Sequence, residues 1–317
     1  MLETSESLPD KTVWPWLPNT FKAKHISPDC SSWPKISIVT PSYNHAAFIE
    51  ATIRSVLLQG YPNLEYIIID GGSTDGTVDI IKKYKEHLTY WVSEKDAGQY
   101  DAINKGFAKS SGEIMFWLNS DDMLCPWAFY VAATVFMQCP DIEWLTSSRP
   151  LTWSQLGLCI ADMPADGFSR KTFYQGRNVR TNHYYHFHIQ QESTFWRRSL
   201  WLRSGGYINA DIDYAGDFDL WARFWEFGDL VCINVPLGGY RRHGDQKALN
   251  DYQRYADEAA TVLKRYDHQP PSSFHIRARS ILTELFPRLS QYLAEKSMHV
   301  AIDPVTGQCR RSCRYII

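Results

Sequence analysis

Hydrophobic and polar positions follow two alternating patterns along the first half of the chain. Short apolar runs are each followed by a segment in which apolar residues recur every three or four positions, as Ile49, Ile53 and Val56 do. The apolar runs predict strands at 36–40, 65–70, 89–93, 113–118 and 142–146, and the amphipathic segments predict helices at 46–59, 77–87, 100–109 and 126–138. Strands joined by helices of this length form parallel βαβ units, so we predict an α/β fold with a mostly parallel, Rossmann-like sheet flanked by helices.

The regular alternation ends near residue 150. Residues 151–195 are rich in loop-forming and aromatic residues, and we expect a short helix near Leu200, a longer one at 218–227 and further helices at 247–292. The chain therefore divides into an N-terminal arm (1–34), a sheet-forming half (35–150), a second half with an irregular insertion (151–246) and a C-terminal helical extension (247–317). The arm carries Trp14 and Trp16, which we expect to pack it against the main body.

The composition is that of an ordinary globular chain and excludes several classes of protein. A formal net charge of -2 argues against a field that attracts nucleic acid or a membrane surface over the whole molecule. No apolar run reaches the roughly 18 residues of a transmembrane segment, and the start of the chain does not resemble a signal peptide. The cysteines, 7 in number, include no C-x-x-C pair and indicate reduced thiols, so we expect a cytoplasmic protein with at most peripheral membrane contact.

Polar residues gather where the expected strands end, and ligands of parallel sheets bind at that edge. The first strand end, 40–44, has no glycine-rich phosphate loop, which disfavours dinucleotide binding and P-loop chemistry. It offers the hydroxyl of Thr40 and the ring edge of Tyr43, which suit a nucleobase and its ribose, while a proline-induced turn also explains the segment. At the second strand end, Asp70 precedes glycines that let a ligand approach the backbone.

The segment Asn119-Ser120-Asp121-Asp122 places two adjacent carboxylates after an apolar run. One interpretation is a turn, because Asn, Ser and Asp side chains hydrogen-bond their own backbone where strands end. The other is a site for a divalent cation that holds a phosphate, because hard cations bind carboxylate and phosphate oxygens together. The motif alone leaves both interpretations open.

Segments 40–44, 70–77 and 119–122, in this order and spacing, together resemble the family 2 glycosyltransferases of GT-A fold. The segment 96–106, Asp-Ala-Gly-Gln-Tyr-Asp-Ala-Ile-Asn-Lys-Gly, extends the resemblance, which covers residues 35–243. The resemblance implies a GT-A fold with a nucleotide-sugar-binding half followed by an acceptor-binding and catalytic half. It also implies a nucleotide-sugar donor and a divalent cation, Mg²⁺ or Mn²⁺.

The resemblance further implies roles for individual residues. The residues expected on the donor side are Thr40, Pro41, Tyr43, Asp70, Asp96, Tyr100, Asn104, Lys105, Asn119, Ser120 and Arg242. Asp121 is expected to bind the metal with help from His243. Asn119 replaces the first acid of the family's D-x-D motif and brings no charge, so metal binding should rest mainly on Asp121. Asp122 could point inward and help to bind the metal, or cap the following helix, and capping is the first expectation.

Asp217 stands where family members carry the base that deprotonates the acceptor hydroxyl. It also opens the expected helix 218–227, so it could instead be the N-cap of that helix. Asp219, two positions later, must point elsewhere because of the helical period. The residues expected on the acceptor side are Gln191, Glu192, Trp196 and Trp221, with the two tryptophans as alternative stacking platforms for a sugar.

The sequence thus predicts an inverting, metal-dependent glycosyltransferase that moves a sugar from a nucleotide sugar, in the first place a UDP-sugar, to a saccharide or lipid-linked acceptor. Because such enzymes build surface polysaccharides and glycolipids, we expect it in the cytoplasm, at the inner face of the membrane. The alternatives are a nucleotide-sugar-binding protein without catalysis and a nucleotidyltransferase, for which the first strand end lacks the Gly- and Lys/Arg-rich signature. No zinc site is expected at His183, His186 and His188, and we expect 309–313 to be a mobile tail.

Overall fold

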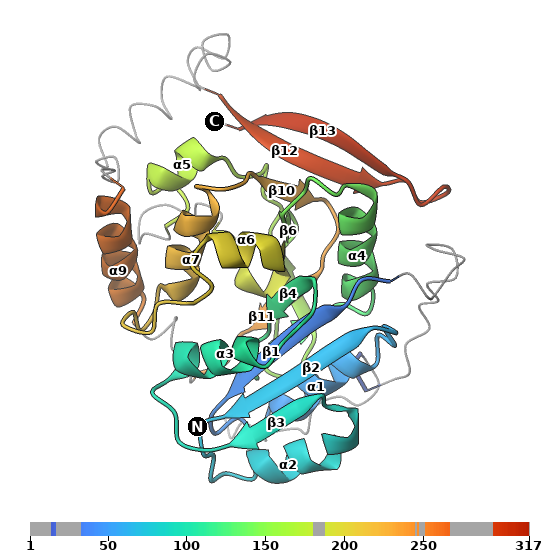
Figure 1. Cartoon of the computed structure of the whole chain (residues 1–317), viewed down its shortest axis with the longest axis vertical. Coiled ribbons are helices and arrows are strands. Elements are labelled where there is room, and N and C mark those ends of the chain that lie inside the picture. Colours follow the sequence, from blue (N-terminus) through green and yellow to red (C-terminus); the bar gives the residue numbers. More distant parts are fainter. Residues whose placement is uncertain are drawn as a thin grey trace, which may run out of the picture.

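Two sheets and the helices around them make up the part of the chain that the computed structural model describes, residues 14–16, 33–179, 188–244, 246, 251–266 and 294–316 (Figure 1). The larger sheet has the order β13-β12-β10-β6-β9-β4-β1-β2-β3. Its strands are β1 (Ile36–Ser42), β2 (Leu64–Asp70), β3 (Tyr90–Ser93), β4 (Ile114–Trp117), β6 (Trp144–Ser147), β9 (Thr194–Arg197), β10 (Leu230–Ile233), β12 (Glu295–Ile302) and β13 (Cys309–Ile316). The smaller sheet has the order β5-β11-β7-β8 and consists of β5 (Met123–Leu124), β7 (Leu151–Trp153), β8 (Cys159–Asp162) and β11 (Gly238–Arg241).

The helices follow the strands as the apolar pattern predicts in the first half of the chain. They are α1 (Ile49–Leu57), α2 (Thr77–Lys83), η3 (Lys85–His87), α3 (Gln99–Ala108), α4 (Ala128–Gln138), α5 (Arg170–Tyr174), η4 (Gln191–Ser193), α6 (Arg198–Arg203), α7 (Gly216–Phe224) and α9 (Tyr252–Lys264). Strands β1 to β4 pair in parallel, whereas β9 and β13 pair antiparallel with their neighbours. The predicted α/β fold with a mostly parallel sheet is confirmed.

Each face of the large sheet has its own apolar core, because successive residues of a strand point to opposite faces. Ile38 of β1 packs in the core that α1 and α4 cover, and the next residue, Val39, packs in the core that α3 and α7 cover. Helix α3 lies very close to β1, since a Cβ on Gly106 would be 2.4 Å from a methyl carbon of Val39. The sheet is thereby fixed between helices on both sides.

The parallel register brings the carboxyl ends of four strands to one edge. Ser42 of β1 lies opposite Asp70 of β2, and Asp70 lies opposite Ser93 of β3. On the other side of β1, Val39 lies opposite Trp117, so the chain after β4 leaves the sheet at the same edge. The polar segments that follow these strands therefore meet, as predicted from the sequence.

The described part of 151–195 is mostly loop, as expected, although its strands β7 and β8 form half of the small sheet. One expectation about the second half of the chain is wrong. The C-terminal extension is helical only in α9 among its described residues, and 295–316 forms the hairpin β12–β13 at the edge of the large sheet (Figure 1). Polar Ser297 and His299 fill buried positions of β12, so the apolar alternation that marks a strand is missing there. Residues 309–313 therefore belong to a strand.

The described part of the N-terminal arm contacts the main body, as expected. The Trp14 indole donates a hydrogen bond of 2.9 Å to the carbonyl of Leu124, and Arg54 of α1 donates to the carbonyls of Pro15 and Trp16. No described helix has the length and apolar character needed to cross a membrane. His183, His186 and residues 267–293 lie outside the described residues, so the expectations about the histidines and the later helices are not addressed there.

Candidate active site

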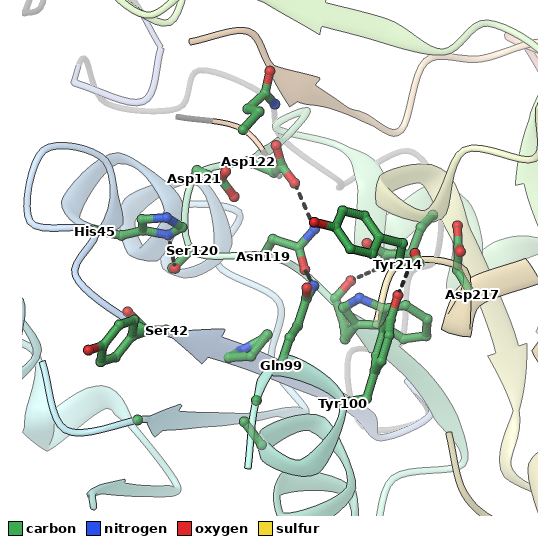
Figure 2. Close-up of a pocket in the computed structure, with 18 of the residues that line it drawn as sticks. Ser42, His45, Gln99, Tyr100, Asn119, Ser120, Asp121, Asp122, Tyr214 and Asp217 are labelled. Atoms are coloured by element: carbon green, nitrogen blue, oxygen red, sulfur yellow. Dashed lines mark hydrogen bonds between the residues drawn. The ribbon is translucent and has the colours of Figure 1, made fainter. Parts of the chain in front are cut away.

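A cavity of about 810 Å³ opens at the carboxyl edge of the large sheet (Figure 2). Segments after β1, β2, β3 and β4 line one part of it, and residues of η4, α7 and α9 line another. Its walls include Pro41, Ser42, Tyr43, Gly71, Gly72, Asp96, Gln99, Tyr100, Asn119, Asp121, Gln191, Glu192, Tyr214, Asp217, Tyr240 and Tyr255. Residues from both halves of the chain therefore line the cavity.

A turn at Asn119–Asp122 forms one side of the cavity. The Asp122 amide donates to the Asn119 carbonyl at 3.1 Å, and the Asn119 side-chain nitrogen donates to Asp122 at 3.1 Å. The other carboxylate oxygen of Asp122 accepts from the Arg241 amide of β11 at 2.8 Å. Burial and the neighbouring Asp121 raise the pKa of Asp122 well above its usual value. Asp122 is structural but does not cap α4, whose N-cap is Trp127.

Asp121 and His243 meet at the end of this turn. Asp121 Oδ2 lies 3.0 Å from His243 Nε2, and the histidine ring packs 4.4 Å from the ring of Phe48. The hydrogen bond from His243 and the charges of His45 and His243 outweigh burial and lower the pKa of Asp121. The other ring nitrogen of His243, Nδ1, is buried and has no hydrogen-bond partner among the described residues.

This pair fits one edge of a divalent-cation site. A carboxylate oxygen and an imidazole nitrogen point at one another, and packing on Phe48 together with the contact to Asp121 holds the ring in place. Within the described residues, no group of three or more His, Cys, Asp or Glu side chains is arranged around a common point. A cation held through one or two side chains, with the remaining positions taken by phosphate and water, matches the coordination that Mg²⁺ favours.

Asp217 lies on the opposite side of the cavity from Asp121, in the first turn of α7 (Figure 2). It is not the N-cap of the helix, because Ala215 occupies that position and has no side-chain cap. Asp217 Oδ1 accepts from the Phe218 amide at 2.8 Å. Burial outweighs its hydrogen bonds and raises the pKa of Asp217 to about 7. At neutral pH this carboxyl group can therefore both accept and release a proton.

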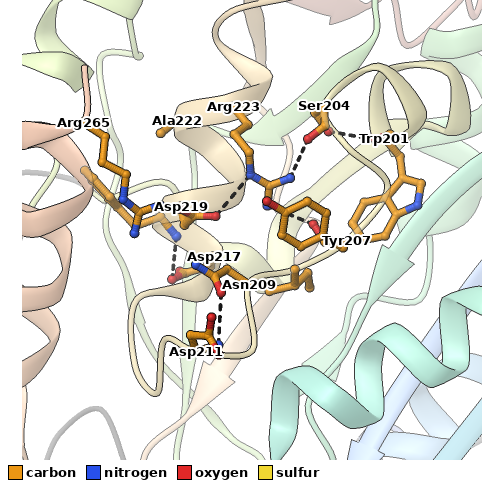
Figure 3. Close-up of polar contacts among 12 residues, drawn as sticks. Trp201, Ser204, Tyr207, Asn209, Asp211, Asp217, Asp219, Ala222, Arg223 and Arg265 are labelled. Atoms are coloured by element: carbon orange, nitrogen blue, oxygen red, sulfur yellow. Dashed lines mark hydrogen bonds and ion pairs between the residues drawn. The ribbon is translucent and has the colours of Figure 1, made fainter. Parts of the chain in front are cut away.

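The neighbouring residue Asp219 points away from the cavity, as the helical period requires. Its carboxylate pairs with Arg223 at 3.1 Å and with Arg265 at 2.7 Å, and Figure 3 shows both arginines converging on it. Arg223 also donates to the carbonyls of Ser204 and Tyr207. Asp219 thus anchors α7, and the two acids of the Gly-Asp-Phe-Asp motif have separate tasks.

Gln191 and Glu192 line the cavity from η4. The Gln191 side-chain amide donates to the Trp117 carbonyl at 2.5 Å, and its own oxygen is buried without a hydrogen-bond partner in the described part of the chain. Burial, with a smaller contribution from the charge of Asp217, raises the pKa of Glu192 to about 7. Two carboxyl groups with raised pKa values therefore face the same space.

Two residues expected to contact a donor are buried behind the cavity wall. Thr40 is fully buried and hydrogen-bonds Tyr66 at 3.2 Å. Asp70 is also fully buried and accepts from the amides of Gly72 and Ser73 at 3.1 and 2.9 Å and from the Ser93 hydroxyl at 2.6 Å. Asp70 thus shapes the loop that lines the cavity, while Pro41, Tyr43 and Asp96 lie in the wall itself.

Other predicted residues also lie away from the cavity lining. Asn104 is engaged by the backbone of Ile208, with which it exchanges hydrogen bonds of 2.7 and 2.8 Å. Lys105 pairs with Asp101 at 3.0 Å, and Arg242 is exposed outside the cavity. Trp196 and Trp221 are core residues with exposed fractions of 0% and 1%, and therefore offer no stacking platform. None of these side chains is therefore placed to contact a ligand in the cavity.

Several lining residues could not be identified from the sequence. His45 shares a hydrogen bond of 2.6 Å with the Ser120 hydroxyl, and Gln99 donates to Asn119 at 2.7 Å. Tyr255 of α9 reaches the cavity from the C-terminal extension and acts to lower the pKa of Asp217. The one signal in the sequence is that Tyr252 and Tyr255 are three positions apart, which places both on the same face of that helix.

Comparison with known proteins agrees with this arrangement. Residues 37–144 match the family model of glycosyl transferase family 2. An uncharacterized glycosyltransferase of Mycobacterium tuberculosis is 31% identical over 215 residues, which cover 65% of this chain and 73% of that protein. The putative teichuronic acid biosynthesis glycosyltransferase TuaG of Bacillus subtilis is 41% identical over 98 residues, which cover 29% of this chain and 38% of TuaG.

Solved structures show the same fold. TarS 1-349 of S. aureus in complex with UDP-GlcNAc has a TM-score of 0.57 at 15% identity, and the match covers 81% of this chain and 73% of that one. In another TarS structure the match covers 44% of the TarS chain. The mannosyltransferase PcManGT of Pyrobaculum calidifontis, in complex with GDP-Man and Mn2+, has a TM-score of 0.53 at 18% identity. The match covers 78% of this chain and 68% of the PcManGT chain.

A sheet of this order with a cavity at its carboxyl edge is the architecture of the GT-A glycosyltransferases. The similarity in sequence to the mycobacterial relative extends over most of that protein. The chain belongs to glycosyltransferase family 2.

Proposed function

We propose that the protein transfers a sugar from a nucleoside-diphosphate sugar to an acceptor hydroxyl with inversion at the anomeric carbon. The observation that carries this proposal is the position of Asp217. Its carboxyl group has a pKa of about 7 and faces the cavity on the side opposite the Asp121–His243 pair (Figure 2). Single displacement at a sugar carbon requires a base on one side of the cavity and, on the other, a group that neutralises the departing diphosphate, which a cation held by Asp121 and His243 would supply.

The donor is expected to lie along the strand ends. Pro41, Tyr43 and Asp96 line the part of the cavity suited to a base and ribose, and Asn119 and Asp121 line the part beyond it. We take a UDP-sugar as the first donor to test and a GDP-sugar as the second, because TarS 1-349 was solved with UDP-GlcNAc and PcManGT with GDP-Man. Both nucleotides carry a diphosphate, which needs positive charge near it when it leaves.

The chemistry follows from these positions. Asp217 accepts the proton of the acceptor hydroxyl as the acceptor oxygen forms a bond to the anomeric carbon, and the bond from that carbon to the diphosphate oxygen breaks. One displacement at the carbon inverts its configuration. Asp121 and His243 would hold a divalent cation, which supplies Lewis-acid neutralisation of the departing diphosphate when it is bound.

The acceptor is expected at the side lined by Gln191, Glu192 and Tyr214. We propose a saccharide or lipid-linked saccharide as acceptor in the synthesis of a surface polysaccharide or glycolipid, because the relative TuaG is a putative teichuronic acid biosynthesis glycosyltransferase. Such an acceptor would be met in the cytoplasm at the inner face of the membrane.

The proposal is tested by incubating the purified protein with UDP-GlcNAc, UDP-glucose, UDP-galactose and GDP-mannose and a panel of p-nitrophenyl glycosides, with Mn²⁺ or with EDTA. We expect Mn²⁺-dependent release of nucleotide with one donor and a product whose anomeric configuration, read by NMR, is inverted. A product of retained configuration would refute the displacement at Asp217, and donor binding without any turnover would support a binding protein instead.

A further inference from the structure

Helix α9 stands against the first turn of α7, which carries Asp217. We propose that α9 is part of the catalytic apparatus, with Tyr255 and Glu258 as positioning residues that hold the Asp217 carboxylate in place. The inference rests on the proposed function, in which Asp217 is the base, and it assigns to the C-terminal extension a task in that reaction.

Glu258 fixes the backbone that leads into α7. Its Oε2 atom accepts hydrogen bonds from the amides of Tyr214 and Ala215 at 2.8 and 2.9 Å. The first amides of a helix have no partner within the helix, and the N-cap residue Ala215 has no side chain that could supply one. A carboxylate from a different helix therefore accepts from the amide of the N-cap residue and from the amide before it, and it fixes the turn that leads to Asp217.

Tyr255 acts on the carboxyl group itself. Its side chain and that of Asp217 line the same cavity, and the Tyr255 hydroxyl acts to lower the pKa of Asp217. Tyr255 and Glu258 are three positions apart, so they lie on the same face of α9. One helix face thus reaches both the backbone before Asp217 and its side chain.

Charged contacts hold α9 at both ends of this interface. Near its start, Arg254 pairs with Asp213 and packs 4.9 Å from the centre of the Tyr214 ring. Just beyond its end, Arg265 pairs with Asp219 at 2.7 Å (Figure 3). The segment between Asp213 and Asp219 is therefore anchored to α9 before and after Asp217.

Helix α3 holds the same turn from the other side. The Tyr100 hydroxyl donates to the Tyr214 carbonyl at 2.8 Å and accepts from the Gly216 amide at 3.0 Å. A Cβ on Gly216 would lie 2.6 Å from the Tyr100 ring, so the turn cannot move towards α3. Because α3 packs against one side of this turn, the contacts with α9 on the other side set the orientation of the Asp217 carboxylate.

The ionisable groups that interact with Asp217 are Tyr100 of α3, Glu192 of η4 and Tyr255 of α9. Glu258 and the Asp213–Arg254 pair surround the turn before it. The Tyr255 hydroxyl favours the charged form of Asp217 and opposes the effect of burial on its pKa. Removing that hydroxyl must therefore raise the pKa of Asp217.

The test compares pH profiles of kcat/KM for the wild type, Tyr255→Phe, Glu258→Ala and Glu258→Gln, with Gln253→Ala as control. Gln253 is exposed on the same helix and bonds only to Asp257 of that helix in the described structure. We expect Tyr255→Phe to move the acidic limb of the profile to higher pH by about 0.5 to 1 unit, with the affinity for UDP unchanged by calorimetry.

Glu258→Ala should lower kcat by roughly 10-fold or more with little change in the KM for donor, because the base is misplaced rather than the donor site altered. Glu258→Gln keeps an acceptor oxygen for the two amides and should recover most of the lost kcat.

A Tyr255→Phe profile that superposes on that of the wild type, in a protein where Asp217→Asn is inactive, would overturn the inference. A wild type without transfer activity would instead refute the proposed function. If Glu258→Ala does not fold, the Tyr255→Phe profile alone decides.

Discussion

Asp217 and Glu192 are two carboxyl groups whose surroundings disfavour their charged forms. Burial raises the pKa of each to about 7. A base must be deprotonated to act, so we predict that kcat/KM rises with pH up to about 7 and is level above about pH 8. Initial rates between pH 5 and pH 9 with the preferred donor check this. A rate that is constant down to pH 5 would show that the base has an ordinary carboxyl pKa.

The same raised pKa has a consequence for stability. Between 3.8 and about 7, the unfolded chain releases the Asp217 proton while the folded chain keeps it, so stability falls as the pH rises through this window. We predict that Asp217→Asn raises the melting temperature at pH 8 and that the difference disappears near pH 4. The control is Asp211→Asn, because Asp211 is exposed. An equal change in the melting temperature of Asp217→Asn at both pH values would contradict the raised pKa of Asp217.

Individual residues show which roles a sequence can reveal. Asp121 and Asp217 could be assigned to the site because they follow a strand and open a helix at fixed places in a motif. Trp196 and Trp221 could not be placed, since a tryptophan in a core and one in a sugar-binding cleft look alike in a sequence. Here they pack on one another, with ring centres 5.8 Å apart, inside the core.

At the scale of elements, α3 carries residues that support the site from outside the cavity. Asn104 exchanges two hydrogen bonds with the backbone of Ile208 and fixes the loop before α7 to α3. We predict that Asn104→Ala lowers the free energy of unfolding by about 1–3 kcal/mol, because the two partner groups lose their bonds. Lys105→Ala, one position along, is the control and should change it by less than about 1 kcal/mol, since its ion pairs are largely exposed. Denaturant unfolding measures the free energy of unfolding of both variants. An equal loss in the two variants would contradict the role of the Asn104 hydrogen bonds.

The elements of the first half were predictable because buried parallel strands and amphipathic helices leave strong periodic signals. Strand β2 is one example, with its run of Tyr66-Ile67-Ile68-Ile69. The hairpin β12–β13 could not be predicted, because its inward positions include Ser297 and His299 and its outer strand is largely exposed. The contribution of α9 to the site was equally hidden, since it depends on contacts with α7 that no local pattern encodes.

At the scale of the whole molecule, the two halves of the chain meet at one cavity. Asp121 comes from the end of the first half and His243 from the end of the second, yet their side chains lie 3.0 Å apart. We predict that Mn²⁺ strengthens UDP binding to the wild type and that Asp121→Ala removes this effect, because a cation would lose its carboxylate ligand. Calorimetric titration of UDP with Mn²⁺ and with EDTA measures it. Asp79→Ala on exposed α2 is the control, and Mn²⁺ enhancement that survives Asp121→Ala would contradict the assignment.

The measurement that tests the central claim most directly is the transfer rate of Asp217→Asn at saturating donor and acceptor. Asparagine keeps the size of the side chain and its acceptor oxygen for the Phe218 amide, but it cannot take a proton. We predict a loss of kcat of at least about 100-fold with the UDP affinity kept within about two-fold of the wild type. Transfer by Asp217→Asn at a rate close to that of the wild type would contradict the claim that Asp217 is the base.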